Sequence, residues 1–220
     1  MLVPKYDLFV FDWDGTIMDT TQPIAEGICY AFEKTGYKPP SVEAARAVIG
    51  LDWQSAILTL VDGFDTSLYD AFEDAYREYY FAREKHVSIF PGLEQLLRNM
   101  HASGLRLAVA TGKSRKGLDR VLDQTGIRDL FEATVTADES AGKPDPLMLQ
   151  MLADETGVEL SQMVMVGDTE HDLWLAKNAG CAAVAVSYGA FPKSKLKEWH
   201  VPVCDNTPQL ASALGVDHLV

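Results

Sequence analysis

The amino-acid sequence predicts an α/β protein with a doubly wound, Rossmann-like parallel sheet and an inserted all-helical domain. An apolar segment at residues 6–11 has the composition of a β-strand. Residues 21–85 then carry apolar side chains mainly at helical spacing, and from Phe90 onward apolar strands alternate with helices. Such alternation implies parallel strands joined by right-handed crossovers. We therefore expect one α/β core formed by residues 1–18 and 88–220, interrupted by a helical cap at 19–87.

Four helices are expected in the cap. The first begins near Thr21 and ends before Gly36, and the next two cover residues 41–48 and 55–60. The fourth, at residues 68–83, carries an aromatic stripe at helical spacing, made of Phe72, Tyr76, Tyr79 and Tyr80. We interpret this stripe as internal packing of a helical bundle, with a platform for a ligand as the alternative.

Helices and strands alternate through the rest of the chain. The expected helices are 92–102, 115–125, 146–156 and 170–179. The expected strands are 106–110, 132–136, 163–166 and 182–186, of which the last completes the sheet. A glycine follows each helix, and glycine readily adopts the left-handed conformation that ends helices.

Composition excludes several classes of function. The 220 residues carry a net charge of −13, which argues against a nucleic-acid surface because phosphate backbones are bound by clusters of Lys and Arg. The three cysteines, Cys29, Cys181 and Cys204, are too few and too scattered for a disulfide framework or a zinc site. No basic-then-apolar leader and no apolar run of about 18 residues is present. We expect a cytoplasmic monomer or homodimer that binds neither nucleic acid nor membranes.

Two carboxylates follow the first strand directly. Asp12 and Asp14 are two positions apart, and Gly15 comes next. Residues two apart in an extended segment point the same way, and glycine allows a sharp turn. Open α/β sheets bind ligands at the carboxyl ends of their strands. The paired like charges favour a divalent cation such as Mg²⁺ between them, although an Asp-Gly pair can also be a turn that closes the strand.

Three later strand ends carry polar groups that complement this pair. In chain order these groups are Thr111, Gly112, Lys143, Asp168 and Asp172. A hydroxyl and an amide can bind a phosphoryl oxygen, a lysine supplies positive charge, and further carboxylates complete an oxygen-ligand metal site. Each group also has an ordinary explanation as a turn or a solvated surface residue. Their ordered recurrence at strand ends favours a single site.

The motifs DWDGT, ATGKS, GKPDP and VGDTEHD, in this order, resemble those of the haloacid dehalogenase-like hydrolases. The resemblance spans residues 7–190, and the insertion after the first motif resembles the helical cap of that family. The segment KSRKGLDR at 113–120 is similar to that of the phosphoglycolate-phosphatase-like subgroup. The resemblance implies a Mg²⁺-dependent phosphatase that acts on a small phosphorylated metabolite, such as a phosphoglycolate-like compound or a sugar phosphate.

The resemblance also assigns roles to individual residues. Asp12 would attack phosphorus and form an aspartyl-phosphate, and Asp14 would act as general acid and then as general base. The phosphoryl oxygens would be bound by Thr111, Gly112 and Lys143. The metal would be held by the carboxylates of Asp12 and Asp168 and by the backbone carbonyl of Asp14. Asp172 would either bind the metal directly or support one of its ligands.

Less specific similarities suggest where the leaving group binds. Gly50 in the cap and Lys113, with its neighbours Arg115 and Lys116, resemble regions where family members meet the substrate. A cluster of basic residues is equally typical of a solvated surface.

Three neighbours of the motifs receive structural interpretations. Trp13 stands between the two acids and should face away from them, into the core. His171 lies between Asp168 and Asp172, but the rotation of a helix should turn it elsewhere. Asp19 could cap the helix that starts near Thr21.

Other functions remain open at this point. A phosphomutase or a pyrophosphatase shares the same core machinery. Dehalogenases of the family lack the acid found here at Asp14, and a phosphonate hydrolase needs a suitable cap lysine, for which Lys34 and Lys38 are poor candidates beside a Gly/Pro break. A phospho-aspartate receiver domain uses an acceptor Asp, a Thr and a Lys, but it is about half as long and has no cap.

Overall fold

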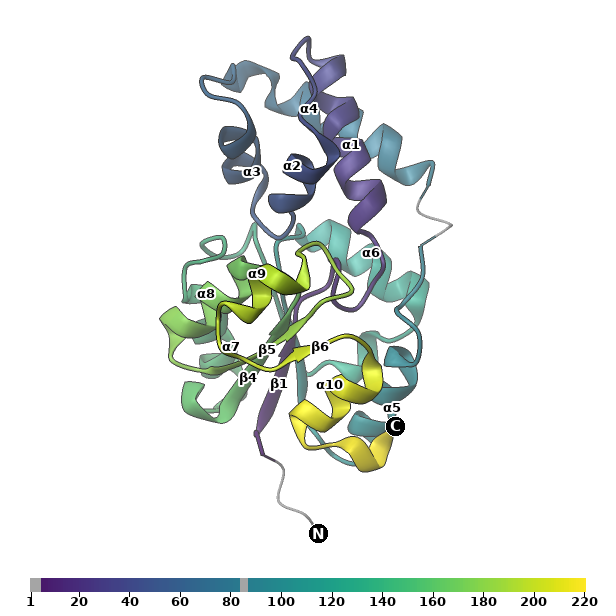
Figure 1. Ribbon diagram of the computed structural model, residues 1–220, viewed down its shortest axis with the longest axis vertical. Helices are drawn as coiled ribbons and strands as arrows, with labels where there is room; N and C mark the ends of the chain where they lie inside the picture. The colour runs from purple at the N-terminus through teal and green to yellow at the C-terminus, as the bar shows by residue number, and fades with distance from the viewer. Residues whose placement is uncertain (1–4, 84–86) are drawn as a thin grey trace.

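A computed structural model describes residues 5–83 and 87–220 of the chain (Figure 1). Six parallel strands form one sheet in the order β3-β2-β1-β4-β5-β6. The strands are β1 (Leu8–Phe11), β2 (Leu107–Thr111), β3 (Ala133–Thr136), β4 (Met163–Gly167), β5 (Ala182–Val186) and β6 (Val203–Cys204). The predicted doubly wound α/β fold with a helical cap is confirmed.

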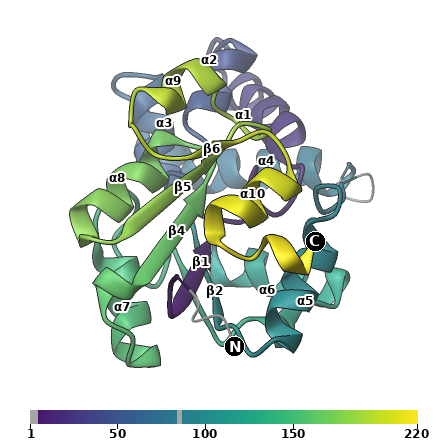
Figure 2. The same cartoon turned by 60° about the horizontal axis from the view of Figure 1, so that its bottom comes forward.

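Helices cover both faces of the sheet, as Figure 2 shows. One face packs on α5 (Leu93–Ala102), α6 (Arg115–Thr125) and α10 (Thr207–Leu214). The opposite face packs on α7 (Leu147–Thr156) and α8 (Glu170–Ala179). Alternate residues of the central strand supply the two cores, with Phe9 and Phe11 on one face and Leu8 and Val10 on the other. Both faces of the strand are therefore buried, as parallel sheets require.

The inserted block forms a separate group of helices above the carboxyl edge of the sheet (Figure 1). Its helices are α1 (Thr21–Lys34), α2 (Val42–Ala47), α3 (Trp53–Leu60) and α4 (Tyr69–Phe81). They share a core of their own, in which Phe72 packs against Phe32 and Phe64. The domain boundaries at 18/19 and 87/88 stay a prediction, since residues 84–86 lie outside the described part of the chain.

Local sequence signals explain where several helices begin. The side chains of Ser41, Asp52 and Ser114 each accept a hydrogen bond from a backbone N–H in the first turn of α2, α3 and α6. The predicted glycine ends are found at Gly126 and Gly157, which are left-handed with φ of 65° and 68°. These caps fix the lengths of the helices and hence the positions of the loops at the sheet edge.

Two features after residue 186 correct the sequence analysis. Strand 182–186 is not the last of the sheet, because β6 pairs in parallel beyond it. The short helix α9 (Lys193–Lys197) and helix α10 also lie in this region. A two-residue strand is too short to produce a period-two pattern, so the sequence held no signal for it.

Short 3-10 turns complete the described structure at Thr66–Leu68, Arg128–Leu130, Leu160–Gln162 and Asp217–Leu219. Among the residues that the structure describes, no helix combines the length and the apolar character that crossing a bilayer requires.

Candidate active site

The predicted acids meet at the carboxyl edge of the sheet. Asp12 and Asp168 directly follow the neighbouring strands β1 and β4, and the backbone N–H of Asp12 donates to the carbonyl of Val166 at 2.9 Å. Asp172 reaches the same point from the first turn of α8. All three carboxylates are buried, and one oxygen of each lies within 4.8 Å of one oxygen of the other two. The parallel sheet thus collects acids that are up to 160 positions apart in the chain.

Lys143 places one cation against this cluster. Its Nζ lies 2.8 Å from Oδ1 of Asp12 and 2.6 Å from Oδ1 of Asp172. Burial works against the charged lysine, but the two carboxylates outweigh it and raise the pKa of Lys143 above its usual range. Lys143 therefore stays protonated and can neutralise one of the three negative charges.

Among the residues that the structure describes, no second cation forms an ion pair with this cluster. Burial is the largest cause that raises the pKa of Asp12 to about 7, against the lowering effect of Lys143. Burial also raises the pKa of Asp168, followed by repulsion from Asp172 and Asp12. Both pKa shifts show that the charged form of these acids is disfavoured, because three carboxylates are buried beside one lysine.

The carboxylate of Asp168 is held in place by two groups far away in the sequence. Thr16 donates its hydroxyl to Oδ1 at 2.9 Å, and the backbone N–H of Ala190 donates to Oδ2 at 2.6 Å. A side chain at Gly189 would collide with this carboxylate. Asp168 is thereby fixed with its remaining lone pairs available to a ligand.

The chemistry of this cluster fits a hard divalent cation. Its donors are carboxylate oxygens, and within residues 5–83 and 87–220 no hydrogen-bond donor reaches Oδ2 of Asp12 although that atom is buried. Both oxygens of Asp172 already accept hydrogen bonds, Oδ1 from Lys143 and Oδ2 from the backbone and hydroxyl of Thr169. Asp12 and Asp168 therefore have more oxygen lone pairs available for a metal ion than Asp172 has.

Asp14 belongs to a second group of contacts. Its carboxylate accepts hydrogen bonds from Nζ of Lys113 at 2.8 and 2.9 Å and from the hydroxyl of Thr20 at 2.8 Å. Burial lowers and Asp14 raises the pKa of Lys113, and the net direction is upward. The side chain of Asp14 is not part of the cluster of Asp12, Asp168 and Asp172.

The predicted phosphate-binding residues border the same space. Thr111 is buried at the end of β2, and its hydroxyl accepts the backbone N–H of Lys113 at 3.2 Å. Gly112 lies directly under the cap, because a Cβ at this position would be 2.5 Å from the carbonyl oxygen of Gly50. Core and cap therefore touch at the point where the substrate is predicted to bind.

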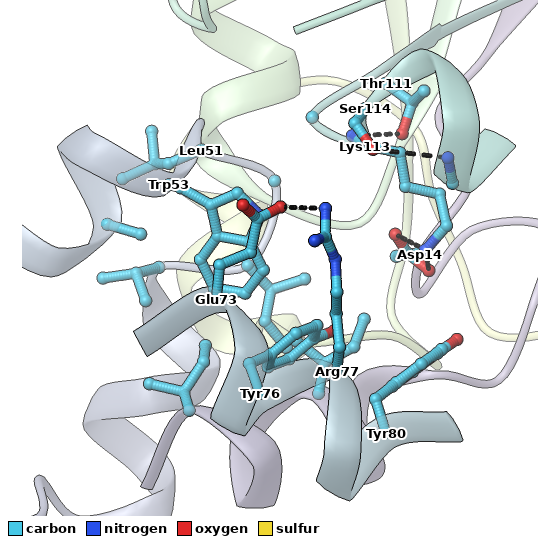
Figure 3. A pocket seen from close by; sticks show the side chains of 18 of the residues that line it. Asp14, Leu51, Trp53, Glu73, Tyr76, Arg77, Tyr80, Thr111, Lys113 and Ser114 are labelled. Carbon is cyan, nitrogen blue, oxygen red and sulfur yellow. Dashed lines mark hydrogen bonds and ion pairs between the residues drawn. The ribbon is translucent and has the colours of Figure 1, made fainter. Parts of the chain in front are cut away.

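A cavity of about 210 Å³ lies between core and cap (Figure 3). Asp12, Asp14, Thr111, Gly112 and Lys113 line its core side. Its cap side includes Gly50 and the side chains of Trp53 and Arg77. Gly50, Lys113 and Lys116, all expected near the substrate, line this cavity.

Some neighbours differ from expectation. Asp19 is exposed and does not cap α1, which has no side-chain cap, and the adjacent Thr20 hydroxyl binds Asp14 instead. Arg115 lies outside the cavity and forms an ion pair with Glu139 at 2.6 Å. The aromatic stripe of α4 does not only pack internally, since Tyr76 and Tyr80 also line the cavity.

Two other interpretations are confirmed. Trp13 is fully buried and packs edge-on against Phe131 at 6.3 Å. His171 points to the cap, where its Nε2 lies 3.2 Å from the carbonyl oxygen of Ala47.

Sequence reasoning missed several residues of the site. Thr20 and Ala190 contact the acids, and Trp53, Glu73 and Arg77 form the cap side of the cavity. The contact of Thr16 with Asp168 could have been suspected, because Thr16 is the last residue of the DWDGT motif. The contact of Ala190 could not, because it is made by a backbone N–H, which nearly every residue type has.

Comparisons with known proteins agree with this geometry. A family model described as haloacid dehalogenase-like hydrolase matches residues 9–186. A protein from Dickeya dadantii named probable phosphatase IndB is 32% identical over 217 residues, which cover 96% of this chain and 93% of that protein. A phosphoglycolate phosphatase from Vibrio vulnificus is 30% identical over 201 residues, covering 86% and 87%.

Solved structures share the fold. The crystal structure of a hydrolase from Pseudomonas syringae superposes with a TM-score of 0.85 at 20% identity, covering 94% of this chain and 97% of the other. The shared architecture includes the cap as well as the sheet, because nearly all of both chains is matched.

Proposed function

The chain belongs to the haloacid dehalogenase-like hydrolases, and we propose from this premise that it is a Mg²⁺-dependent phosphoric monoester hydrolase. Its substrate would be a small phosphorylated metabolite, and the reaction would pass through an aspartyl-phosphate. Relatives named phosphatase and phosphoglycolate phosphatase support this activity. The location in the cytoplasm and a monomeric or dimeric state stay predictions.

In the first step, an oxygen of Asp12 attacks phosphorus while the bond between phosphorus and the ester oxygen breaks. Asp14 gives its proton to the departing oxygen, which leaves as an alcohol. Lys143, Thr111 and the Gly112 amide hold the other phosphoryl oxygens by charge and hydrogen bonds. A Mg²⁺ held by Asp12, the carbonyl of Asp14 and Asp168 would offset the repulsion between the attacking carboxylate and the phosphoryl oxygens.

In the second step, Asp14 takes a proton from a water molecule, which attacks phosphorus and breaks the bond to Asp12. Inorganic phosphate leaves and the Asp12 carboxylate is restored. The contacts with Lys113 and Thr20 keep the Asp14 side chain at the cavity wall. Asp172 supports the site indirectly, because it holds Lys143 beside Asp12.

A single observation carries this proposal. Oδ2 of Asp12 is buried and lacks a hydrogen-bond donor among the described residues, while Oδ1 is paired with Lys143 at 2.8 Å. A buried carboxylate oxygen without a partner is costly and therefore typical of functional sites. Such an oxygen is available for a metal or for phosphorus.

The test is the replacement Asp12→Asn. Phosphate release from a generic aryl phosphate in the presence of Mg²⁺ should fall to the uncatalysed rate, since an amide is not a nucleophile of this kind. The matched control is Asp19→Asn, which makes the same exchange at an exposed acid nearby and should keep wild-type activity. Circular dichroism should show both variants folded, and retained turnover by Asp12→Asn would remove the nucleophile assignment.

A further inference from the structure

We propose that the cap of this protein selects a phosphate monoester whose leaving group is a neutral alcohol that carries a ring. The inference rests on the proposed function, because it concerns the alcohol that the same site would release. It comes from the size, the walls and the charge balance of the cavity between core and cap.

The cavity is larger than a two-carbon leaving group needs. Its volume is about 210 Å³. This volume exceeds that of a cavity of about 150 Å³ that holds a benzene ring. A leaving group of ring size would therefore fill the space that a smaller one leaves to water.

The cap side of the cavity is largely apolar. Ile28 of α1, Ile49 and Leu51 of the link between α2 and α3, and Ala56 of α3 all line it. Apolar walls favour the transfer of apolar surface from water and offer no hydrogen bonds to a charged group. The part of the substrate beyond its phosphate should therefore be mostly apolar.

Aromatic rings complete this wall. Trp53 meets Tyr76 edge-on with centroids 4.4 Å apart, and Tyr76 stacks on Tyr80 at 5.6 Å with an interplanar angle of 15°. Figure 3 shows the three rings beside the cavity, on the side opposite Thr111 and Ser114. Trp53 is partly exposed, whereas Tyr76 and Tyr80 are buried behind it. The ring of Trp53, held by these neighbours, forms a rigid surface on which a further flat ring can pack.

The positive charges around the cavity already have partners or face water. Among the described lining residues, the cations are Arg77, Lys113, Lys116 and Arg120. Arg77 pairs with Glu73 at 2.5 Å, and Lys113 pairs with Asp14. The guanidinium of Arg120 lies over the ring of Phe81, 4.0 Å from its centroid, and Lys116 is exposed.

These charges and the apolar wall disfavour a leaving group that carries a carboxylate. A carboxylate against the apolar wall would lose its hydration. The lining cations Arg77 and Lys113 are each already paired with an acid. A neutral ring-bearing alcohol avoids this cost.

Three substrates that all release a primary alcohol distinguish a ring-bearing leaving group from a small or a charged one. We would measure kcat/KM for benzyl phosphate, ethyl phosphate and phosphoglycolate with the wild-type protein and Mg²⁺. Benzyl phosphate should exceed the other two by about tenfold or more, because apolar pocket contacts discriminate by roughly 10–200-fold. Equal values, or a preference for phosphoglycolate, would overturn the inference.

Trp53 is the specificity-determining residue to vary. Trp53→Ala should lower kcat/KM for benzyl phosphate about tenfold and change the value for ethyl phosphate less than about twofold, whereas Trp53→Phe should retain most of the preference. The control is Leu58→Ala on the same helix, where the side chain is exposed and outside the cavity. An equal loss of kcat/KM for both substrates would contradict a role of Trp53 in substrate selection. If a variant does not fold, the comparison of the three substrates with the wild-type protein still tests the inference.

The same measurements separate this inference from the proposed function. Release of phosphate from phosphoglycolate or ethyl phosphate alone would refute the ring-bearing leaving group and leave the phosphatase intact. Failure to release phosphate from any of the three, at the level of Asp12→Asn, would refute the phosphatase itself.

Discussion

Adding one methyl group at Gly112 should separate the cap from the core. A Cβ at this position would lie 2.5 Å from the carbonyl oxygen of Gly50 and 2.8 Å from its carbon, whereas ordinary contacts begin at 3.4 Å. Both partners are backbone, so no side chain can rotate away. Gly112→Ala therefore requires a displacement of about 0.9 Å at the place where cap and core touch.

The cost should appear in catalysis more than in folding. Alanine keeps the amide that we expect to bind phosphate, so any loss reflects the position of the cap. A misplacement near 1 Å can reduce turnover about 100-fold, while overpacking typically costs about 1–3 kcal/mol of stability. We expect kcat/KM for an aryl phosphate to fall by about two orders of magnitude and the protein to remain folded at 25 °C.

Steady-state phosphate release and thermal unfolding, measured on the same samples, check this prediction. The control is Gly157→Ala, where the backbone is left-handed with φ of +68° and a Cβ meets nothing within 4 Å. It should cost about 1–2 kcal/mol and leave kcat/KM unchanged. Wild-type kcat/KM in Gly112→Ala would refute the reasoning that core and cap must close at this contact.

Two further predictions concern the charges of the site. Chelation by EDTA should stop phosphate release and added Mg²⁺ should restore it, because the buried acids outnumber their cation; a rate unchanged by EDTA would contradict the metal assignment. Lys143→Met should abolish activity and lower the free energy of unfolding by about 3–5 kcal/mol in EDTA, because it leaves Asp12 and Asp172 buried without a cation. Urea titration at neutral pH measures this loss, and unchanged stability would show that the lysine is not needed to balance the acids.

The fold was largely predictable because its long elements carry clear periodic signals. The apolar strands and the glycine-ended helices of the core lie within one or two residues of their predicted limits. The pairing of β6 was not predictable, since Val203 and Cys204 form too short a strand to leave a pattern. Its place in the sheet depends on tertiary contacts alone.

The site was predictable where chemistry and topology coincide. Asp12 and Asp168 follow strands, and the order of a parallel sheet brings such positions together. Contacts set by side-chain direction were not predictable, as with Lys113 and Asp14, which are 99 positions apart. Asp19 shows the limit of local reasoning, because the N-cap position of α1 is the next residue, Thr20, and no side chain caps this helix.

The central claim is that Asp12 forms a covalent bond to phosphorus while Asp14 moves protons. It is tested most directly by mixing the Asp14→Asn variant with an activated aryl phosphate and Mg²⁺, quenching with acid, and mapping peptides by mass spectrometry. An activated leaving group needs little protonation, but hydrolysis of the intermediate still needs the base, so phosphorylated protein should accumulate. The account predicts one added phosphoryl group on the peptide that contains Asp12, and release of the aryl alcohol with no phosphorylated Asp12 at any quench time would contradict it.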